Sequence, residues 1–126
     1  MEFPKNLKYT KDHEWIDVQG KTGTIGVTSY AIEQLGDIVY IDLPEAGKSF
    51  KAGDSFGTIE STKTVSDLYM PITGKITEVN TAVKGSPESL QSDAYKNGWL
   101  VKIELDNPSD ASKLLDAGSY ESFVKE

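Results

Sequence analysis

One lysine, Lys63, is the residue whose surroundings point most clearly to chemistry. Strand-forming residues at 56–59 and 65–70 flank the polar residues 61–64 that contain it. This pattern predicts a β-hairpin whose loop presents the lysine amine to solvent. A lysine amine is protonated at neutral pH, so it is a poor nucleophile unless its surroundings activate it, and the sequence shows no such surroundings. We therefore expect Lys63 to be acylated by another enzyme and not to catalyse a reaction itself.

The composition limits the possible functions. The chain has 126 residues and a formal net charge of −7. Nucleic acids and anionic membrane surfaces are bound by basic patches, so an acidic chain argues against both partners. The sequence contains no cysteine, which excludes disulfides, thiolate catalysis and thiolate metal sites. Any sulfur redox chemistry must therefore come from an attached group.

Length and composition also predict how the chain is organised. We expect one domain over residues 1–126, since no linker or low-complexity segment divides the chain. Residues 1–8 lack the apolar stretch of a signal peptide, and no apolar run reaches the length of a membrane span. These features predict a cytoplasmic protein, and an organellar protein that has lost its transit peptide is the alternative. We also expect a monomer.

Short elements surround the Lys63 hairpin in the predicted fold. Strand patterns occur at residues 15–18, 24–27, 38–43, 75–79 and 99–105, the first two forming an N-terminal hairpin. A short helix over residues 30–35, ended by Gly36, and helical turns over residues 87–92 are also expected. A C-terminal helix is predicted over residues 110–124, with an interruption at Gly118.

A sequence repeat gives Lys63 a place within this fold. Residues 44–48 (PEAGK) return 27 positions later as residues 71–75 (PITGK), and residues 51–54 have a weaker counterpart at residues 83–86. Each copy reads as a strand, a Pro-x-x-Gly turn, a second strand and a Lys/Gly turn. Two such units would pack face to face as a small sandwich or flattened barrel. The Lys63 hairpin joins the units, so its tip should project from one end.

Several longer segments carry a resemblance to a known family. They are ESTK at 60–63, SDLYMPITG at 66–74, KDHEW at 11–15, GDIVYIDLP at 36–44, EVN at 78–80 and GWLVK at 98–102. Together they resemble the H-protein family of the glycine cleavage system, over nearly the whole chain. In lipoyl domains, glycines lie 16 residues before and 11 residues after the lysine that carries the cofactor, and this chain has Gly47 and Gly74 there. We expect the turn before Gly74 to require a positive φ at that glycine.

The flanks of Lys63 distinguish two cofactors. Biotin carriers resemble lipoyl domains but place Met on both sides of the modified lysine, whereas this chain has Thr62 and Thr64. Members of the H-protein family often carry Val and Ala at these two positions. The resemblance therefore implies lipoate, attached covalently to Lys63.

The resemblance implies a fold and a function. The fold would be mainly β, a barrel-sandwich hybrid of two pseudo-repeated β units with an N-terminal β-hairpin and short flanking helices, one of them C-terminal. The protein would be a non-catalytic carrier. It would take the aminomethyl group of glycine from a pyridoxal-phosphate glycine decarboxylase to a tetrahydrofolate-dependent aminomethyltransferase, and electrons to dihydrolipoyl dehydrogenase. Lipoylating enzymes would be further partners.

The resemblance also assigns roles to individual residues. Those expected to set the recognition and geometry of the hairpin are Glu60, Ser61, Gly47 and Gly74. Those expected to line a cleft that shelters the loaded arm are Glu14, Asp67 and Asp12. From the residues alone, Glu14 reads more readily as a charged residue at the start of a strand, beside a core Trp. His13 is the single histidine, so a metal site is not expected and His13 receives no catalytic role.

Two other functions are compatible with much of this pattern. An octanoyl or lipoyl relay, which hands acyl groups to other lipoyl domains, would have nearly the same sequence. A lipoyl domain cut from a 2-oxo acid dehydrogenase acyltransferase fits less well, because such domains lack the additional N-terminal hairpin and C-terminal helix.

Overall fold

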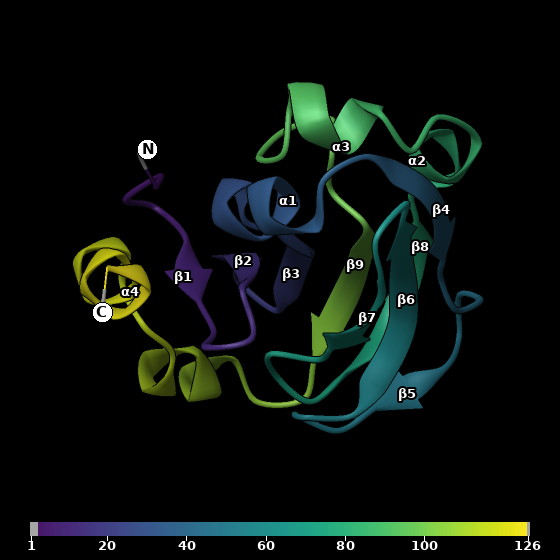
Figure 1. Ribbon diagram of the computed structural model, residues 1–126. Helices are drawn as coiled ribbons and strands as arrows, with labels where there is room; N and C mark the ends of the chain where they lie inside the picture. Colours follow the sequence, from purple (N-terminus) through teal and green to yellow (C-terminus); the bar gives the residue numbers. More distant parts are fainter. Residues whose placement is uncertain (1–2, 126) are drawn as a thin grey trace.

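Two antiparallel β-sheets form most of the structure, a computed structural model that describes residues 3–125 (Figure 1). The larger sheet contains, in spatial order, β1 (Lys8–Tyr9), β2 (Glu14–Gln19), β3 (Thr22–Val27), β9 (Val101–Leu105), β8 (Gly74–Val79) and β5 (Ser49–Phe50). The smaller sheet contains β4 (Ile38–Asp42), β6 (Ser55–Ser61) and β7 (Val65–Tyr69). The predicted mainly β fold with an N-terminal hairpin, formed by β2 and β3, is confirmed.

Short helices flank the sheets. They are α1 (Ser29–Leu35), α2 (Thr81–Gly85), α3 (Ser89–Ser92), a 3₁₀ helix (Pro108–Lys113) and α4 (Ala117–Val124). Helix α1 begins where Thr28 Oγ1 accepts a hydrogen bond from the backbone N–H of Ala31 at 3.2 Å, and it ends at Gly36 as predicted. Strands β1 and β5 and helix α2 are too short or too polar to have been predicted from pattern alone.

The predicted interruption of the C-terminal helix at Gly118 is wrong. Helix α4 runs through Gly118, and the chain is instead extended at Leu115, between the 3₁₀ helix and α4. Leu115 exchanges two backbone hydrogen bonds with Tyr9, of 2.8 and 2.9 Å, which hold this segment in a β-bridge. Asp116 then starts α4, because its Oδ1 accepts the backbone N–H of Ser119 at 2.8 Å. Tertiary pairing and a cap therefore set the boundary, and the glycine does not.

The stronger part of the sequence repeat, at residues 44–48 and 71–75, has a structural basis. Strands β4 and β7 lie 27 residues apart in sequence, at Ile38–Asp42 and Val65–Tyr69, and both flank β6 in the smaller sheet. The two repeat turns also meet, because Ser49 pairs with Lys75 between β5 and β8. The weaker counterpart at residues 83–86 is wrong, since that segment lies at the end of helix α2 and not in a turn between strands. The chain between β8 and β9 carries α2 and α3 in its place.

Two apolar clusters fill the interior. The larger lies between the sheets and is built from inward-facing side chains such as Ile25 and Ile103 of one sheet and Ile41 and Ile59 of the other, all at most 1% exposed. The smaller cluster is aromatic and joins the C-terminal helix to the N-terminal strands. Its buried members are Phe3, Leu7, Tyr9, Trp15 and Tyr120.

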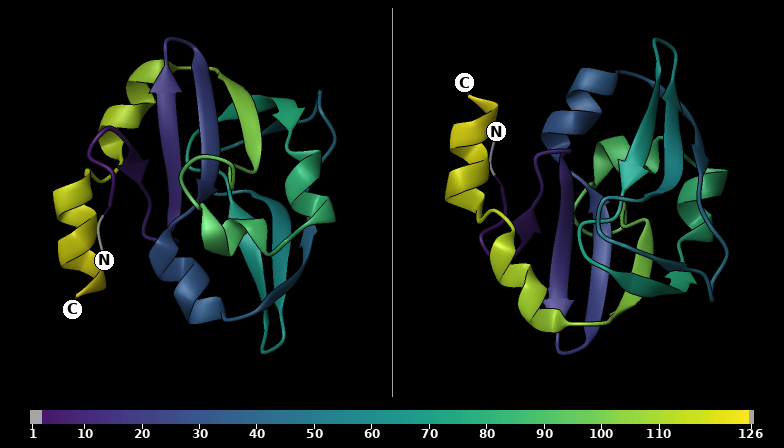
Figure 2. Two further views of the ribbon diagram at one scale, coloured as in Figure 1. Left: turned by 90° about the horizontal axis from the view of Figure 1, so that it is seen from above. Right: turned by 90° about the horizontal axis from the view of Figure 1, so that it is seen from below.

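The β6–β7 hairpin projects from one end of the molecule, beside α1. Figure 2 shows this in both of its views, where the teal hairpin extends past the sheets next to the blue helix. A backbone hydrogen bond of 3.0 Å from Thr62 N–H to the carbonyl oxygen of Asp37 ties the tip of the hairpin to the segment after α1. The tip of the predicted hairpin is therefore presented at an end, as the repeat indicates, and it is held in place from one side.

Candidate functional site

The tip that carries Lys63 is organised by one serine side chain. The Oγ atom of Ser61 accepts hydrogen bonds from the backbone N–H groups of Lys63 and Thr64, both at 3.2 Å. The Ser61 N–H donates to the Thr64 carbonyl oxygen at 2.8 Å, closing the turn between β6 and β7. A serine hydroxyl can replace the turn-forming glycine or asparagine by bonding the backbone in this way. The geometric role expected of Ser61 thus has a definite basis.

Lys63 itself is exposed and lies over the end of helix α1. A Cβ atom placed on Gly36 would be 3.1 Å from Cε and 3.6 Å from Nζ of Lys63, so the lysine side chain crosses this glycine closely. The flexible lysine could move aside for a Cβ there, so it is the φ of 82° at Gly36 that favours glycine. A group attached to the Lys63 amine therefore starts from the end of α1, the helix that borders the cleft described below.

The two glycines at the family spacings are needed for different reasons. Gly47 has a φ of 99°, a conformation that side chains rarely adopt, and its N–H donates to the carbonyl oxygen of Ile76 at 2.7 Å. Gly74 does not have a positive φ, so that part of the prediction is wrong. A Cβ atom at Gly74 would lie 2.7 Å from the carbonyl oxygen of Glu104, and close packing against β9 therefore excludes any side chain.

Exposed apolar side chains lie next to the tip of the β6–β7 hairpin. Glu60 is exposed on β6, and its pairing partners are Tyr40 on β4 and Val65 on β7. Tyr40 and Val65 are 52% and 61% exposed, unusually high for large apolar side chains. The sequence analysis named Glu60 but missed its two neighbours. Their strand register, which places all three in one row, becomes visible only in the folded sheet.

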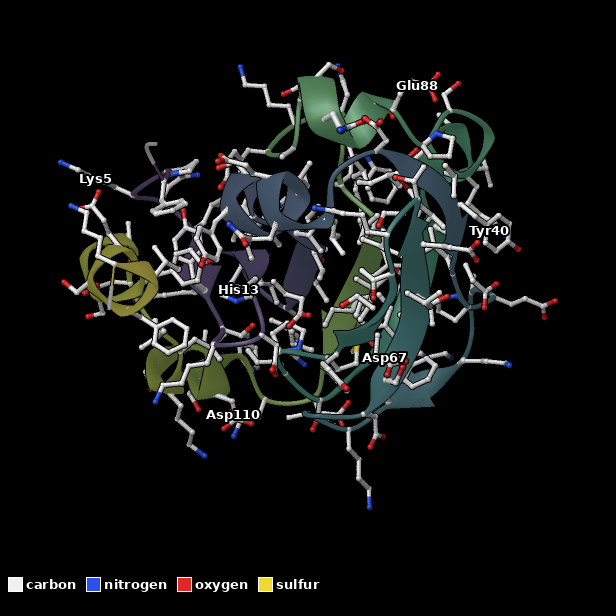
Figure 3. All side chains as sticks on the ribbon, in the orientation of Figure 1. Lys5, His13, Tyr40, Asp67, Glu88 and Asp110 are labelled. Atoms are coloured by element: carbon white, nitrogen blue, oxygen red, sulfur yellow. The ribbon has the colours of Figure 1, made fainter. Side chains whose placement is uncertain are left out.

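A cleft of about 310 Å³ lies between α1, the start of β2 and β7, and it brings together the three acidic residues expected there. Asp12 and Glu14 enter it from the N-terminal side and Asp67 from β7. Figure 3 labels two residues of its lining, Asp67 on β7 and His13 in the turn just before β2. Sequence reasoning missed the helical wall, formed by Tyr30, Ala31, Gln34 and Leu35. The 3.6-residue spacing of these positions on α1 is the signal that could have found it.

Glu14 is buried in this cleft, with 1% of its surface exposed. Its Oε1 accepts the hydroxyl of Thr10 at 2.8 Å, and its Oε2 accepts the backbone N–H of Tyr69 at 3.3 Å. Burial raises the pKa of Glu14 to about 8, although both hydrogen bonds oppose the rise; the neighbouring Asp12 adds to it. The carboxyl group is therefore largely protonated near pH 7 when nothing cationic lies beside it.

Asp67 and Asp12 are exposed at the mouth of the cleft, in contrast to Glu14. Asp67 accepts hydrogen bonds from the hydroxyls of Ser55 at 3.3 Å and Tyr69 at 3.5 Å. The site thus combines a solvated acidic rim with one buried carboxyl group. This arrangement suits a positively charged amine that enters from the side of Lys63.

Comparison with known proteins agrees with this geometry. A profile described as "Glycine cleavage H-protein" matches residues 7–126. The chain belongs to the glycine cleavage H-protein family. It is 51% identical to the glycine cleavage system H protein of Symbiobacterium thermophilum over 123 residues, covering 98% of this chain and 96% of that one. It is 50% identical to the protein of that name from Bacteroides thetaiotaomicron, covering 98% of each.

A solved structure supports the same relationship. The crystal structure of a glycine cleavage system H protein from Mycobacterium marinum superposes with a TM-score of 0.91 at 42% identity, covering 98% of this chain and all of that one. Membership of this family makes the chain a lipoyl carrier subunit of the glycine cleavage system and not an enzyme in its own right. The resemblance seen in the sequence is confirmed.

Two features are absent from the described residues. Over residues 3–125, no group of three or more His, Asp or Glu side chains is placed to hold a metal ion. Within the same part of the chain, no helix has the length and apolar character needed to cross a membrane.

Proposed function

We propose that Lys63 carries a lipoyl group and that residues 1–126 act as one cytoplasmic lipoyl-carrier domain. The observation that carries this proposal is the geometry of the tip. Lys63 is exposed on a turn that Ser61 closes, and its side chain lies against the end of α1. When bound, lipoate supplies a dithiolane that can be opened and closed by reduction and oxidation. The residues of this chain supply the attachment point and the cleft that would hold the cargo, the aminomethyl group of glycine.

The reach of the arm matches the layout of the site. Standard bond lengths give a lysine–lipoyl arm of about 14 Å. The cleft begins along α1, which Lys63 contacts through Gly36, so an arm of this length can turn from solvent into the cleft. Tethering also gives the arm a high effective concentration at each partner's active site. We propose that these partners are the decarboxylase, the aminomethyltransferase, dihydrolipoyl dehydrogenase and the lipoylating enzymes.

The charge state of Glu14 fits an amine cargo. In the empty cleft Glu14 keeps its proton, which avoids an unpaired buried charge. A protonated amine beside Glu14 would favour the ionised carboxylate, so docking of the cargo would release one proton to solvent. The cargo would then be held by a charge-assisted hydrogen bond while it is kept from water. The acyl relay, the second candidate, has no use for such a group.

The attachment site is tested by the intact mass and peptide map of the chain after co-expression with a lipoylating enzyme. We expect one lipoyl adduct, on the peptide that contains Lys63, and none in Lys63→Arg. Lys51→Arg is the matched control, because Lys51 is also exposed in a turn between strands. Lipoylation that persists in Lys63→Arg, or that is lost in Lys51→Arg, would contradict the assignment.

The cleft is tested on the lipoylated chain after loading by a competent glycine decarboxylase. Without the aminomethyltransferase, an unsheltered cargo decomposes to formaldehyde and ammonia. We expect Glu14→Ala to release formaldehyde faster than the wild type while carrying the same amount of lipoate. Equal rates would remove Glu14 from the sheltering role. A wild-type chain that cannot be loaded at all would favour the relay.

A further inference from the structure

The backbone at the edge of the cleft contains one strained residue. Over residues 3–125, His13 is the only residue other than glycine with a positive φ, at 71°. Its backbone groups are tied on both sides. The His13 N–H donates to the Thr10 carbonyl oxygen at 3.1 Å, and the His13 carbonyl oxygen accepts the N–H of Thr28 at 3.0 Å. A conformation that side chains disfavour persists only where the surrounding structure enforces it, so His13 calls for a restraint of its own.

That restraint is a hydrogen bond to the C-terminal helix. The Nδ1 atom of His13 lies 2.7 Å from the hydroxyl of Tyr120 on α4, and the same hydroxyl lies 2.7 Å from Oγ1 of Thr28. Tyr120 and Thr28 are fully buried. The imidazole of His13 also lies 5.0 Å from the ring of Tyr30, centroid to centroid. Figure 3 shows His13 between α4 and the elements that form the cleft.

The three polar groups form a hydrogen-bonded chain. Thr28 Oγ1 accepts the N–H of Ala31 as the cap of α1, and its own proton can be donated to Tyr120. The proton of Tyr120 can in turn be donated to Nδ1 of a neutral His13 imidazole. Burial lowers the pKa of His13, in agreement with that state, although Asp12 opposes the effect. The chain therefore joins α4, the start of α1 and the turn before β2.

We propose that Tyr120 is a positioning residue for the cleft: its hydrogen bond to His13 holds the turn at residues 10–13 in the shape that buries Glu14. The turn matters to Glu14 because Thr10 provides two of its restraints. Thr10 Oγ1 donates to the Glu14 carboxyl group at 2.8 Å and accepts the Glu14 N–H at 3.1 Å. Release of His13 would let this turn relax toward ordinary φ values and move Thr10 away from Glu14. The C-terminal helix then acts on the cleft without lining it.

The structure offers a matched pair of substitutions. Tyr9 and Tyr120 are both fully buried, their rings stack with centroids 4.9 Å apart, and each hydroxyl has a hydrogen-bond partner. The hydroxyl of Tyr9 donates to the carbonyl oxygen of Pro4, away from the cleft. Tyr120→Phe and Tyr9→Phe therefore both remove a buried hydroxyl and keep the ring. Only the first removes the partner of His13.

The first measurement is the titration of Glu14 in the unmodified chain by carboxyl ¹³C NMR, so it does not depend on the proposed function. We expect Tyr120→Phe to lower the pKa of Glu14 by about one unit, because water reaches a loosened turn and burial, the largest cause of the raised pKa, outweighs the opposing loss of the Thr10 hydrogen bond. Tyr9→Phe should leave the pKa unchanged even if it lowers the melting temperature by a similar amount. The proposal would be overturned if Glu14 had the same pKa in wild type and Tyr120→Phe, or if its pKa fell equally in Tyr120→Phe and Tyr9→Phe.

A second variant separates positioning from general stability. His13→Gly relieves the positive φ and removes the imidazole, so strain at His13 alone predicts a more stable chain with an unchanged turn. We expect instead that the Glu14 pKa falls, as in Tyr120→Phe, because the turn loses its hydrogen bond to Tyr120 and a glycine there does not hold one shape. In the lipoylated and loaded chain, a step that rests on the proposed function, formaldehyde release should rise about fivefold in both variants, the usual worth of one hydrogen bond. An unchanged Glu14 titration in His13→Gly would contradict the proposal whatever the loaded chain does.

Discussion

The raised pKa of Glu14 has a measurable consequence for stability, which Glu14→Gln isolates. Below pH 4.5, the ordinary value, the carboxyl group is protonated in the folded and the unfolded chain and contributes no pH dependence. Between pH 4.5 and about 8, the unfolded chain loses this proton and the folded chain keeps it. The free energy of unfolding therefore falls as the pH rises through this window, and the fall stops above the folded-state pKa.

The size of the effect follows from the two pKa values. One pKa unit corresponds to about 1.4 kcal/mol, so the slope contributed by Glu14 is about 1.4 kcal/mol per pH unit. The rise from 4.5 to about 8 then costs about 5 kcal/mol of stability at the alkaline end of the window. This is a large share of the stability of a small domain. Glutamine cannot ionise, and its amide can accept from Tyr69 and donate to Thr10, so Glu14→Gln should keep the fold and lose the slope.

The assay is urea unfolding followed by the fluorescence of the buried Trp15, at intervals across the window from pH 4.5 to about 8. The difference in unfolding free energy between Glu14→Gln and wild type should grow steadily in favour of the variant as the pH rises. Other titrating groups, including His13, are present in both chains and cancel in the difference to first order. A difference that does not change with pH would show that Glu14 is ionised in the folded chain and would refute the reasoning.

Two further substitutions test the geometry of the hairpin and its support. Gly74→Val should destabilise the fold by about 2–3 kcal/mol, because its Cβ would overlap the Glu104 carbonyl oxygen; an unchanged urea midpoint would contradict this packing. Ser61→Ala should leave the sheets intact but free the tip, because the Lys63 and Thr64 N–H groups lose their acceptor. We expect faster amide exchange at Lys63 and slower lipoate attachment, with Thr62→Ala as the exposed control. Equal exchange in both variants would show that the Ser61 hydroxyl does not organise the turn.

Much of the scaffold could be predicted because local signals and tertiary structure agree. In β3 the apolar residues Ile25 and Val27 alternate in the sequence and are both buried, and α1 carries both a cap and a terminal glycine. One error in the predicted fold has a distant contact as its cause, because Leu115 is extended where it pairs with Tyr9. The other lies at residues 83–85, which end helix α2 although their sequence resembles a turn. Such pairings between distant segments leave no periodic pattern in the sequence.

In the candidate site, too, local features could be predicted from the sequence and the effects of distant contacts could not. Lys63 could be proposed as the attachment site because the hairpin propensity around it is a local feature and the family resemblance supplies the spacing of Gly47 and Gly74. The reason why position 74 requires glycine could not be predicted, since it depends on the close approach of β9 and not on the φ of Gly74. The protonation of Glu14 was also beyond the sequence, because the shift arises from burial beneath β7, a strand 55 residues away in the chain. The sequence states which residues carry a carboxyl group, and packing determines which of these groups stay protonated near neutral pH.

The proton on Glu14 allows one carboxyl group to meet two opposing requirements of the cleft. A carboxylate buried without a partner is costly, yet a site for a protonated amine needs a negative charge at the moment of docking. An exposed carboxylate would be stable when empty, but water would screen it and reach the cargo. On the proposed function, a carboxyl group with a pKa of about 8 would be neutral in the empty cleft and would become charged when the amine arrives. The two hydrogen bonds from Thr10 and Tyr69 are already in place for the charged form, so docking requires loss of one proton and no rearrangement of the site. Retention of the cargo should therefore weaken as the pH falls, because the proton that docking releases competes with the amine for Glu14.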